Sequence, residues 1–521
     1  MNEITADQVT KSKVTSEDCT WHRSAIELTA IVTLYLALAF FRLDGQSFWT
    51  DEALSLTERL RGPETYRISP LYYVLLGLWS TLTGTTEFAL RAFSALLGTA
   101  AVCITYAIAH IWINRKTAVF GAILLATSPY FIWYAQEVRW ISLTFATSLL
   151  MTYWFIRAIS AGSWRIWLFY GASSLLALSS FVTVVLLVWA HGLFLLCCRS
   201  YRPLLRIWLP LQLLIQLVFV IWIGVQAGPE LAAALTTTPS ITADDLTRSG
   251  EYLPVLDVVG IIPYTFYAFS TGFSLGPSLR ELHVTRSINT LVSYAPTLLP
   301  LALLFGTIIG LGLMKLWQNR NLRIFLLLWL SVPILGTYIV ATTTTFHEYN
   351  TRYVAISLPA YILILATAIA GFRRYVTQLV LLGSLLVVNG ASLANYYFDT
   401  EYAREDARSA AKYLQSSGQP GDLILLNGNA AAFQHYYRAG LPVVRVAGQI
   451  TKEPSVVHVN GKLPEISKNH GFAWLVEIRP WETDPQSIVK ATLDRLALLR
   501  TSKSFPGVDV FHYELGAAAS K

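Results

Sequence analysis

Residues 25–52 read AIELTAIVTLYLALAFFRLDGQSFWTDE, an apolar run followed by two adjacent carboxylates, Asp51 and Glu52. The apolar run 25–41 is close to the length that a helix needs to cross the hydrocarbon core of a bilayer. Ionised side chains are costly beside lipid, so an acidic pair at this border needs an explanation. The simplest one is a solvated loop or the first turn of a surface helix, where acidic residues are favoured.

The composition of the chain is that of a polytopic membrane protein. Of its 521 residues, 54% are hydrophobic and only 14% are charged, which excludes an ordinary soluble domain. The net charge of +7 is expected to mark cytoplasmic loops rather than nucleic-acid binding. The four cysteines lack the spacing of metal ligands, so neither a disulfide framework nor a zinc site is predicted.

The basic residues predict how the chain crosses the membrane. Five short polar breaks contain Lys or Arg without Asp or Glu and are predicted to face the cytoplasm, namely 114–116, 157–165, 199–206, 315–323 and 373–374. The acidic breaks between them then face outward. This alternation requires residues 71–82 to form a short helix on the outer surface instead of a span. About eleven spans are then predicted, at 25–41, 88–112, 117–134, 140–159, 166–181, 182–198, 207–226, 294–314, 324–341, 354–371 and 376–395.

The topology divides the chain into three parts, which are a cytoplasmic tail at 1–24, an all-α membrane domain at 25–395 and a small extracytoplasmic α/β domain at 396–521. In the membrane domain, outer loop 1 covers 42–87 and a long outer loop covers 227–293. In the last domain, the patterns predict helices at 402–415 and 488–499 and strands at 422–426, 443–446, 472–478 and 508–515.

The topology also gathers ionisable residues from distant parts of the chain at the outer membrane interface. They are Asp51, Glu52, Arg67, Arg91, Glu137, Arg139, His347, Glu348 and Arg352. Each Arg taken alone is better explained as an anchor at the lipid headgroups. The gathering of all these residues at one interface is better explained by a functional site. Arginines bind phosphate by charge-assisted hydrogen bonds, and a carboxylate can deprotonate an attacking hydroxyl. A lipid-phosphate-linked donor with an outer acceptor would use both, because Arg stabilises the charge on a departing phosphate.

Four segments resemble motifs of bacterial membrane glycosyltransferases of the GT-C class, in the group related to protein O-mannosyltransferases and lipid A aminoarabinose transferases. They are 47–53 (SFWTDEA); 69–73 (SPLYY) with 84–94 (GTTEFALRAFS); 128–129 (SP) with 134–140 (YAQEVRW); and 352–353 (RY) with Pro359. The resemblance covers residues 25–371. It departs from the family at Ile68-Ser69-Pro70, where many relatives have His-Pro-Pro or Lys-Pro-Pro, and Arg67 is the candidate replacement for the missing base.

The resemblance implies the GT-C fold, a donor sugar linked to polyprenyl phosphate, and inversion at the anomeric carbon. It implies that Asp51 is the catalytic base and that Glu52 assists it or contacts the acceptor. The residues expected to bind the donor phosphate are Arg91, Arg139, Arg352 and Arg67. Those expected to contact donor or acceptor are Glu137, Tyr134, His347, Glu348 and Tyr353.

No metal and no cofactor are expected, since a carboxylate pair alone is an incomplete ligand set for Mg²⁺ or Mn²⁺. The expected partners are the polyprenyl-phosphate-linked sugar, a glycolipid, polysaccharide or protein acceptor, and membrane lipid. The expected location is the bacterial inner (plasma) membrane, with the amino terminus in the cytoplasm and the active site and C-terminal domain outside.

Two other classes of protein compete with this interpretation. A transporter or flippase of lipid-linked sugars would have paired half-molecules and polar residues near the middle of the membrane, and the sequence shows neither. A non-catalytic assembly protein would have no use for Asp51.

Overall fold

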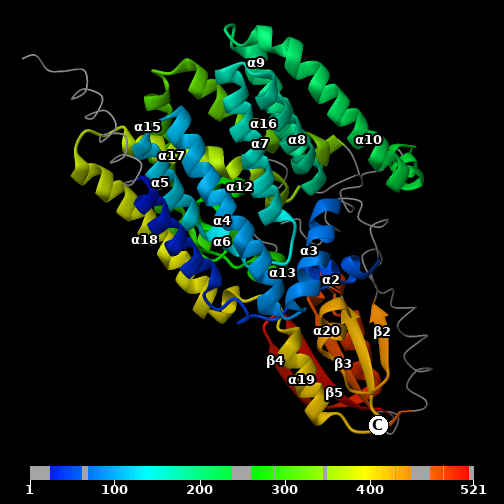
Figure 1. Ribbon diagram of the computed structural model, residues 1–521. Helices are drawn as coiled ribbons and strands as arrows, with labels where there is room; N and C mark the ends of the chain where they lie inside the picture. The colour runs from blue at the N-terminus through cyan, green and yellow to red at the C-terminus, as the bar shows by residue number, and fades with distance from the viewer. Residues whose placement is uncertain are drawn as a thin grey trace, which may run out of the picture.

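The computed structural model describes residues 24–61, 69–236, 260–285, 288–343, 349–428, 430–447, 470–484 and 486–515. It consists of a large bundle of helices with a small α/β unit at one end (Figure 1). This arrangement confirms the predicted fold class, an all-α membrane part followed by a small C-terminal sheet.

The bundle begins with a helix at Ser24–Phe40. The helices that follow it are α2 (Thr50–Arg61), α3 (Pro70–Thr83), α4 (Glu87–Trp112), α5 (Arg115–Ala126), α6 (Pro129–Ala135), α7 (Ile141–Ala161), α8 (Trp164–Ser180), α9 (Val184–Cys197), α10 (Leu205–Thr236), α12 (Ile261–Thr271), α13 (Leu279–Thr285), α14 (Ile288–Ser293), α15 (Ala295–Leu316), α16 (Arg320–Thr343), α17 (Leu358–Ala370) and α18 (Tyr375–Phe398). Short 3₁₀ helices lie at η2 (Arg202–Leu204) and η3 (Thr351–Ser357).

Each predicted span coincides with helical structure, and the span 117–134 coincides with the pair α5 and α6, which is bent by 58°. Among the described residues, six helices are long and apolar enough to cross a membrane, or seven if the bent pair is one span. The chain is therefore a multi-pass membrane protein, while the number of about eleven spans stays a prediction. Helix α3 has 14 residues, in agreement with the short helix predicted at 71–82.

The C-terminal unit is a five-stranded sheet in the order β2-β1-β3-β5-β4. Its strands are β1 (Leu423–Gly428), β2 (Val443–Ala447), β3 (Phe472–Ile478), β4 (Ala497–Phe505) and β5 (Val508–Leu515), and its helices are α19 (Ala407–Ser417), α20 (Ala430–Tyr436), α22 (Pro480–Thr483) and α23 (Ile488–Leu496), after the 3₁₀ turn η4 (Thr400–Tyr402). Strand β1 runs parallel to β2 and β3, whereas β5 is antiparallel to β3 and β4. The central strands β1 and β3 are apolar and almost wholly buried, as is typical of parallel strands covered on both faces.

Two predicted elements of this unit were wrong at one end. The helix predicted at 488–499 ends at Leu496, and β4 follows at once. Strand β4 is an exposed edge strand with the sequence ALLRTSKSF, so it has no buried face to produce an alternating apolar pattern. The helix predicted at 402–415 begins only at Ala407, because the Asp406 side chain caps it by accepting a hydrogen bond from the backbone N–H of Ser409.

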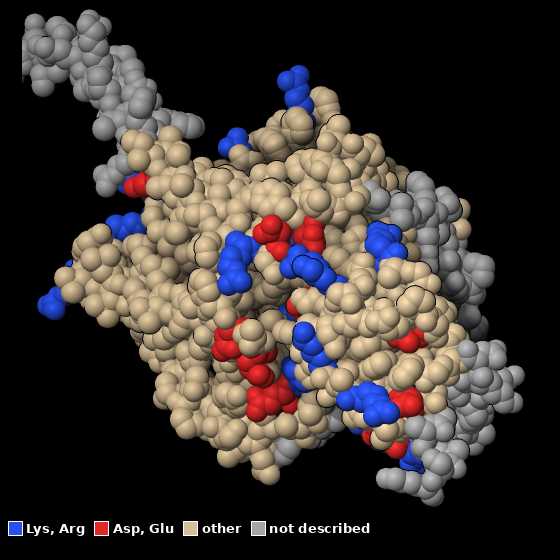
Figure 2. Space-filling view, turned by 90° about the horizontal axis from the view of Figure 1, so that it is seen from below, with Lys and Arg blue, Asp and Glu red and all other residues tan. Residues whose placement is uncertain are grey.

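The C-terminal unit packs on the part of outer loop 1 that precedes α2. The backbone N–H of Phe48 donates to the Tyr436 hydroxyl at 2.7 Å, and the Ser47 hydroxyl donates to the Glu405 carbonyl at 2.6 Å. Seen from below, acidic and basic side chains gather towards the middle of the molecule, whereas the surrounding surface is largely uncharged (Figure 2). The predicted site residues Asp51 and Glu52 directly follow the loop residues that make this contact with the C-terminal unit.

Candidate active site

The two carboxylates in the first turn of α2 lie in different environments, because successive helical residues point about 100° apart. Glu52 is fully buried, whereas the side chain of Asp51 is 16% exposed. Glu52 accepts a hydrogen bond from the backbone N–H of Val138 at 2.9 Å and forms a buried ion pair with Arg91 on α4. Glu52 thus anchors the loop, while Asp51 keeps some access to its surroundings.

Arg91 holds outer loop 1 together with all five of its N–H groups. Its Nε and Nη2 atoms donate to Glu52 at 2.9 and 2.6 Å. Its remaining donors reach the carbonyl oxygens of Leu43, Gln46 and Ser47 at 2.8–3.0 Å. Because a guanidinium group has five N–H donors in all, none is left for a phosphate in this geometry. In this geometry Arg91 is a structural clasp of outer loop 1, and the donor-binding role expected for it stays a prediction.

Asp51 lies between two arginines that the sequence analysis also selected. Nη1 of Arg352, on η3, donates to Oδ2 of Asp51 at 2.5 Å, across 301 positions of the chain. Nη2 of Arg139 lies 3.6 Å from the same oxygen, and its Nη1 donates to the backbone carbonyl of Asp51 at 3.4 Å. The structure thus brings Asp51, Arg139 and Arg352 together as predicted.

The arginines keep Asp51 ionised. Burial by itself would raise the pKa of this carboxyl, but the positive charges of Arg139, Arg352 and Arg479 outweigh it and lower the pKa to about 2. Glu52 behaves in the same way, because the charge of Arg91 outweighs burial and lowers its pKa. Both acids are therefore negative at any physiological pH.

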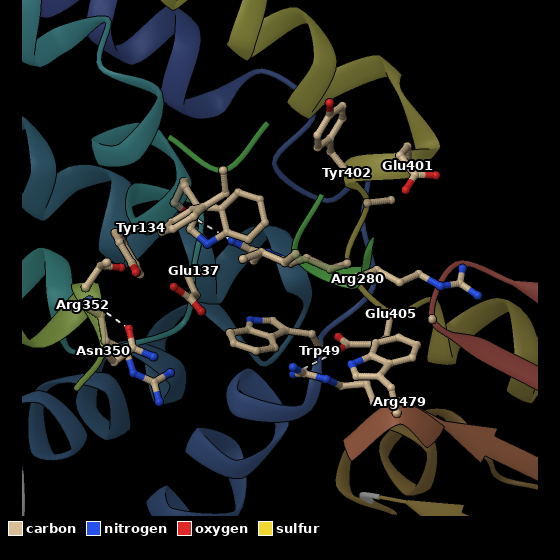
Figure 3. Close-up of a pocket in the computed structure, with 18 of the residues that line it drawn as sticks. Trp49, Tyr134, Glu137, Arg280, Asn350, Arg352, Glu401, Tyr402, Glu405 and Arg479 are labelled. Carbon is tan, nitrogen blue, oxygen red and sulfur yellow. Dashed lines mark hydrogen bonds and ion pairs between the residues drawn. The ribbon is translucent and has the colours of Figure 1, made fainter. Parts of the chain in front are cut away.

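Beside this cluster lies a cavity of about 190 Å³ between the helical bundle and the C-terminal unit. Its walls include aromatic rings, namely Trp49, Trp133, Tyr134, Tyr264, Phe273, Tyr349, Tyr402 and Trp481. Four arginines also line it, namely Arg280, Arg352, Arg404 and Arg479. In Figure 3, Tyr134, Glu137 and Arg352 lie on one side of Trp49, and Arg280 and Arg479 lie on the other.

Only some of the remaining predicted residues line the cavity. Tyr134 and Glu137 line the cavity, and Glu137 is 1% exposed. Tyr353 is not among the residues that line it; its ring stacks near Trp140 and Phe181, and its carbonyl accepts a hydrogen bond from Thr183. Arg67, His347 and Glu348 lie outside the described residues.

The sequence analysis missed three of the four cavity arginines, namely Arg280, Arg404 and Arg479. Arg404 is only 7% exposed and donates to the carbonyls of Gln136 and Trp133 at 3.2 and 3.1 Å. It lies in the segment that was predicted to be a helix at 402–415, and no pattern marked it as part of the site. Arg479 comes directly after β3 and pairs with Glu405 at 3.2 Å. A signal did exist for Arg479, because functional groups often follow the carboxyl ends of parallel strands.

Burial perturbs one more acid in the cavity. It raises the pKa of Glu137 to about 7, with the positive charge of Arg404 acting in the opposite direction. Among the residues that the structure describes, no three His, Cys, Asp or Glu side chains are grouped so that they could hold a metal ion. What the site offers is thus one ionised carboxylate clamped by arginines, one carboxyl that titrates near neutral pH, and aromatic surface.

Comparisons with known proteins bear on this arrangement. A family model described as dolichyl-phosphate-mannose-protein mannosyltransferase matches residues 67–224, while no curated protein matches the sequence. ArnT from Cupriavidus metallidurans bound to undecaprenyl phosphate has a TM-score of 0.55 at 13% identity, covering 95% of this chain and 99% of that one. The same protein in the apo state gives 0.55 at 12% identity, covering 94% and 98%.

A second solved protein has the same architecture. The archaeal oligosaccharyltransferase AglB from Archaeoglobus fulgidus, in complex with an inhibitory peptide and a dolichol-phosphate, gives a TM-score of 0.51 at 11% identity. The match covers 94% of this chain and 74% of that one. These likenesses confirm the resemblance expected from the motifs: the chain has the GT-C fold of these proteins, and its residues 67–224 match the dolichyl-phosphate-mannose-protein mannosyltransferase family model.

Proposed function

We propose that the protein is an integral-membrane glycosyltransferase that moves a sugar from a polyprenyl-phosphate donor to an acceptor outside the cytoplasm. The fold and the family match support the class of reaction. The undecaprenyl phosphate bound to ArnT and the dolichol-phosphate bound to AglB support the kind of donor. The observation that carries the proposal is the contact of Asp51 with Arg352 at the wall of an aromatic cavity.

The cavity suits a sugar phosphate. Aromatic rings such as Trp49 and Trp133 offer apolar faces on which a sugar ring can pack, and their N–H groups add polar contacts. Arg352 lines the cavity and carries a planar guanidinium that can bind a phosphate through two hydrogen bonds. The donor phosphate is therefore proposed to bind at Arg352, with the sugar beside Trp49 and Glu137.

In the proposed reaction Asp51 is the general base. The acceptor hydroxyl attacks the anomeric carbon while Asp51 takes up its proton. The bond from that carbon to the phosphate oxygen breaks, and its electron pair leaves with the phosphate, where Arg352 stabilises the negative charge. Attack from the face opposite the phosphate inverts the anomeric configuration.

Arg352 also links donor binding to the strength of the base. The pKa of about 2 held by the three arginines lies far below the value at which a general base works best near neutral pH. A donor phosphate that takes over the contact with Arg352 removes part of this positive influence from Asp51. The pKa of Asp51 then rises, and the carboxylate becomes a better proton acceptor as the donor arrives.

The C-terminal unit is proposed to help bind the acceptor. Its Arg479, Trp481 and Gly507 form part of the cavity wall, so an acceptor that approaches between this unit and the helices reaches the donor sugar. A glycolipid, a polysaccharide or a protein fits this approach. The proposed location is the bacterial inner membrane, with the amino terminus in the cytoplasm and the cavity outside.

The test is to offer the purified protein, reconstituted in vesicles, a panel of radiolabelled polyprenyl-phosphate sugars together with membrane acceptor fractions. The proposal expects one donor to be consumed, with release of polyprenyl phosphate and transfer of label to an acceptor. Movement of intact lipid-linked sugar across the bilayer without release of polyprenyl phosphate would instead show a transporter.

A further inference from the structure

Glu137 is a buried acid whose carboxyl group forms no hydrogen bond or ion pair with the residues that the structure describes. It lines the cavity and is 1% exposed, and its Oε2 atom has no hydrogen-bond partner. None of the ion pairs in the described part of the chain includes it, although four arginines line the same cavity. Buried polar groups nearly always have a partner, so this carboxyl is arranged for a group that comes from outside the chain.

The surroundings of Glu137 favour its neutral form. Burial has the largest effect on its pKa and raises it to about 7. The charged groups that act on it are Arg404 before α19, Arg139 in the following turn, and Glu52 and Asp51 on α2. Tyr134 on α6 and Tyr396 on α18 are the other titratable side chains that interact with it. The two arginines lower the pKa of Glu137 and the two carboxylates raise it. Because these effects oppose each other, burial determines the direction of the shift.

Binding of the donor would strengthen this preference. A phosphate entering the cavity adds a negative charge near Glu137, and the sugar displaces water from it. Both changes disfavour a second carboxylate charge. A neutral carboxyl group offers an O–H donor and a carbonyl acceptor, which together match the donor and acceptor capacity of a sugar hydroxyl.

We propose, on the basis of the function proposed above, that Glu137 is a specificity-determining residue that binds, in its protonated form, hydroxyl groups of an uncharged donor sugar. A sugar that carries a carboxylate there is disfavoured, because a carboxylate only accepts hydrogen bonds and leaves the carbonyl oxygen of protonated Glu137 without a donor. The sugar transferred is therefore a neutral hexose or pentose rather than a uronic acid.

The experiment uses the purified full-length protein and undecaprenyl-phosphate donors that carry either a neutral hexose or the matching uronic acid. Initial rates are measured on both sides of pH 7, over a range in which the donor phosphodiester keeps its single charge. For wild type and the neutral donor, KM is expected to rise about tenfold from one pH unit below the pKa of Glu137 to one unit above it, because only the protonated form binds. The uronate donor is expected to be a poor substrate.

Glu137→Gln is the matched variant, since it is nearly isosteric and stays neutral. Its KM is expected to be independent of pH and close to the low-pH value of wild type. Glu137→Leu removes the hydrogen bonds and is expected to raise KM about tenfold at every pH. Binding of undecaprenyl phosphate, which has no sugar, is expected to survive in both variants and shows that they are folded.

Three results would overturn the assignment: a KM of wild type that is flat through pH 7, equal use of the uronate donor, or a loss of kcat in Glu137→Gln as large as that in Asp51→Asn. The last result would make Glu137 a proton-transfer group instead. A wild type that consumes no polyprenyl-phosphate sugar overturns the proposed function and this assignment together, whereas transfer with a flat KM overturns only the assignment.

Discussion

Arg91 and Glu52 form a buried two-point ion pair that ties helix α4 to the first turn of α2, with Nη2 2.6 Å from Oε2 and both side chains at most 2% exposed. The same guanidinium donates hydrogen bonds to three carbonyl oxygens of outer loop 1. The loop is thus folded around one arginine. Because Asp51 is the neighbour of Glu52, its position depends on this clasp.

Replacement of Arg91 by Met is expected to destabilise the protein by about 3–5 kcal/mol, because it leaves the buried Glu52 charge without its main partner. The measurement is thermal unfolding of the purified protein in detergent. Arg408→Met is the control, since Arg408 also contacts the loop carbonyls of Asp44 and Gly45 but is 39% exposed, and such a surface contact is worth about 1 kcal/mol or less. A normal unfolding temperature with a raised KM for the donor would instead make Arg91 a phosphate ligand.

Replacement of Arg352 by Gln is expected to lower kcat/KM about 10²–10³-fold, as for the loss of a group that stabilises transition-state charge. It is also expected to change the pH profile. The pKa of Asp51 is depressed to about 2 by Arg139, Arg352 and Arg479, so wild type keeps this carboxylate ionised down to strongly acidic pH. Without Arg352 the pKa of Asp51 rises. The acidic limb of the activity profile, where Asp51 becomes protonated, therefore moves to higher pH.

Arg139→Gln is the companion to that variant. It also removes a charge beside Asp51, so the acidic limb of its profile should move in the same direction. Its effect on kcat/KM should be smaller, because Arg139 is not among the residues that line the cavity. An acidic limb that is unchanged in both variants would contradict the role given to Asp51.

Gly507→Ala tests the close packing of the C-terminal unit on the site. A Cβ atom there would lie 2.8 Å from Cγ of Glu405, the partner of Arg479, at a φ of +64°. The substitution is expected to displace Glu405 and lower activity about tenfold, as small misplacements at active sites do. Gly421→Ala is the matched control, since Gly421 has a φ of +99° but open space around it. Equal activity of the two variants would show that this contact does not matter for the reaction.

The fold could be predicted from the sequence because it depends on local patterns of apolar residues and short motifs. Apolar runs of helical length gave the bundle, and four motifs in order gave the GT-C resemblance that the comparisons confirm. The strand at Phe472–Ile478 was predicted at the bounds that the structure shows, since Glu477 is the one polar residue in its apolar run. The edge strand β4 was missed because seven of its nine residues are exposed, which leaves no apolar pattern.

The site was harder to predict, because its contacts are not local. Spacing cannot show that Arg91 would use every N–H group on Glu52 and a loop, since that depends on the path of the loop in space. Nor does a charged stretch reveal that Arg404 is buried, because the same letters describe a solvated helix. The meeting of Asp51 with Arg352 could be expected only because the alternating charges assigned both residues to one membrane face.

The most direct test of the account is the rate of sugar transfer by purified Asp51→Asn, measured beside wild type with the donor that wild type consumes. Asparagine nearly preserves the shape of the side chain but cannot accept the proton. The account predicts a fall in kcat of about 10²-fold or more, with an unfolding temperature close to that of wild type and retained binding of undecaprenyl phosphate. Transfer at the wild-type rate would contradict the central claim that Asp51 is the catalytic base.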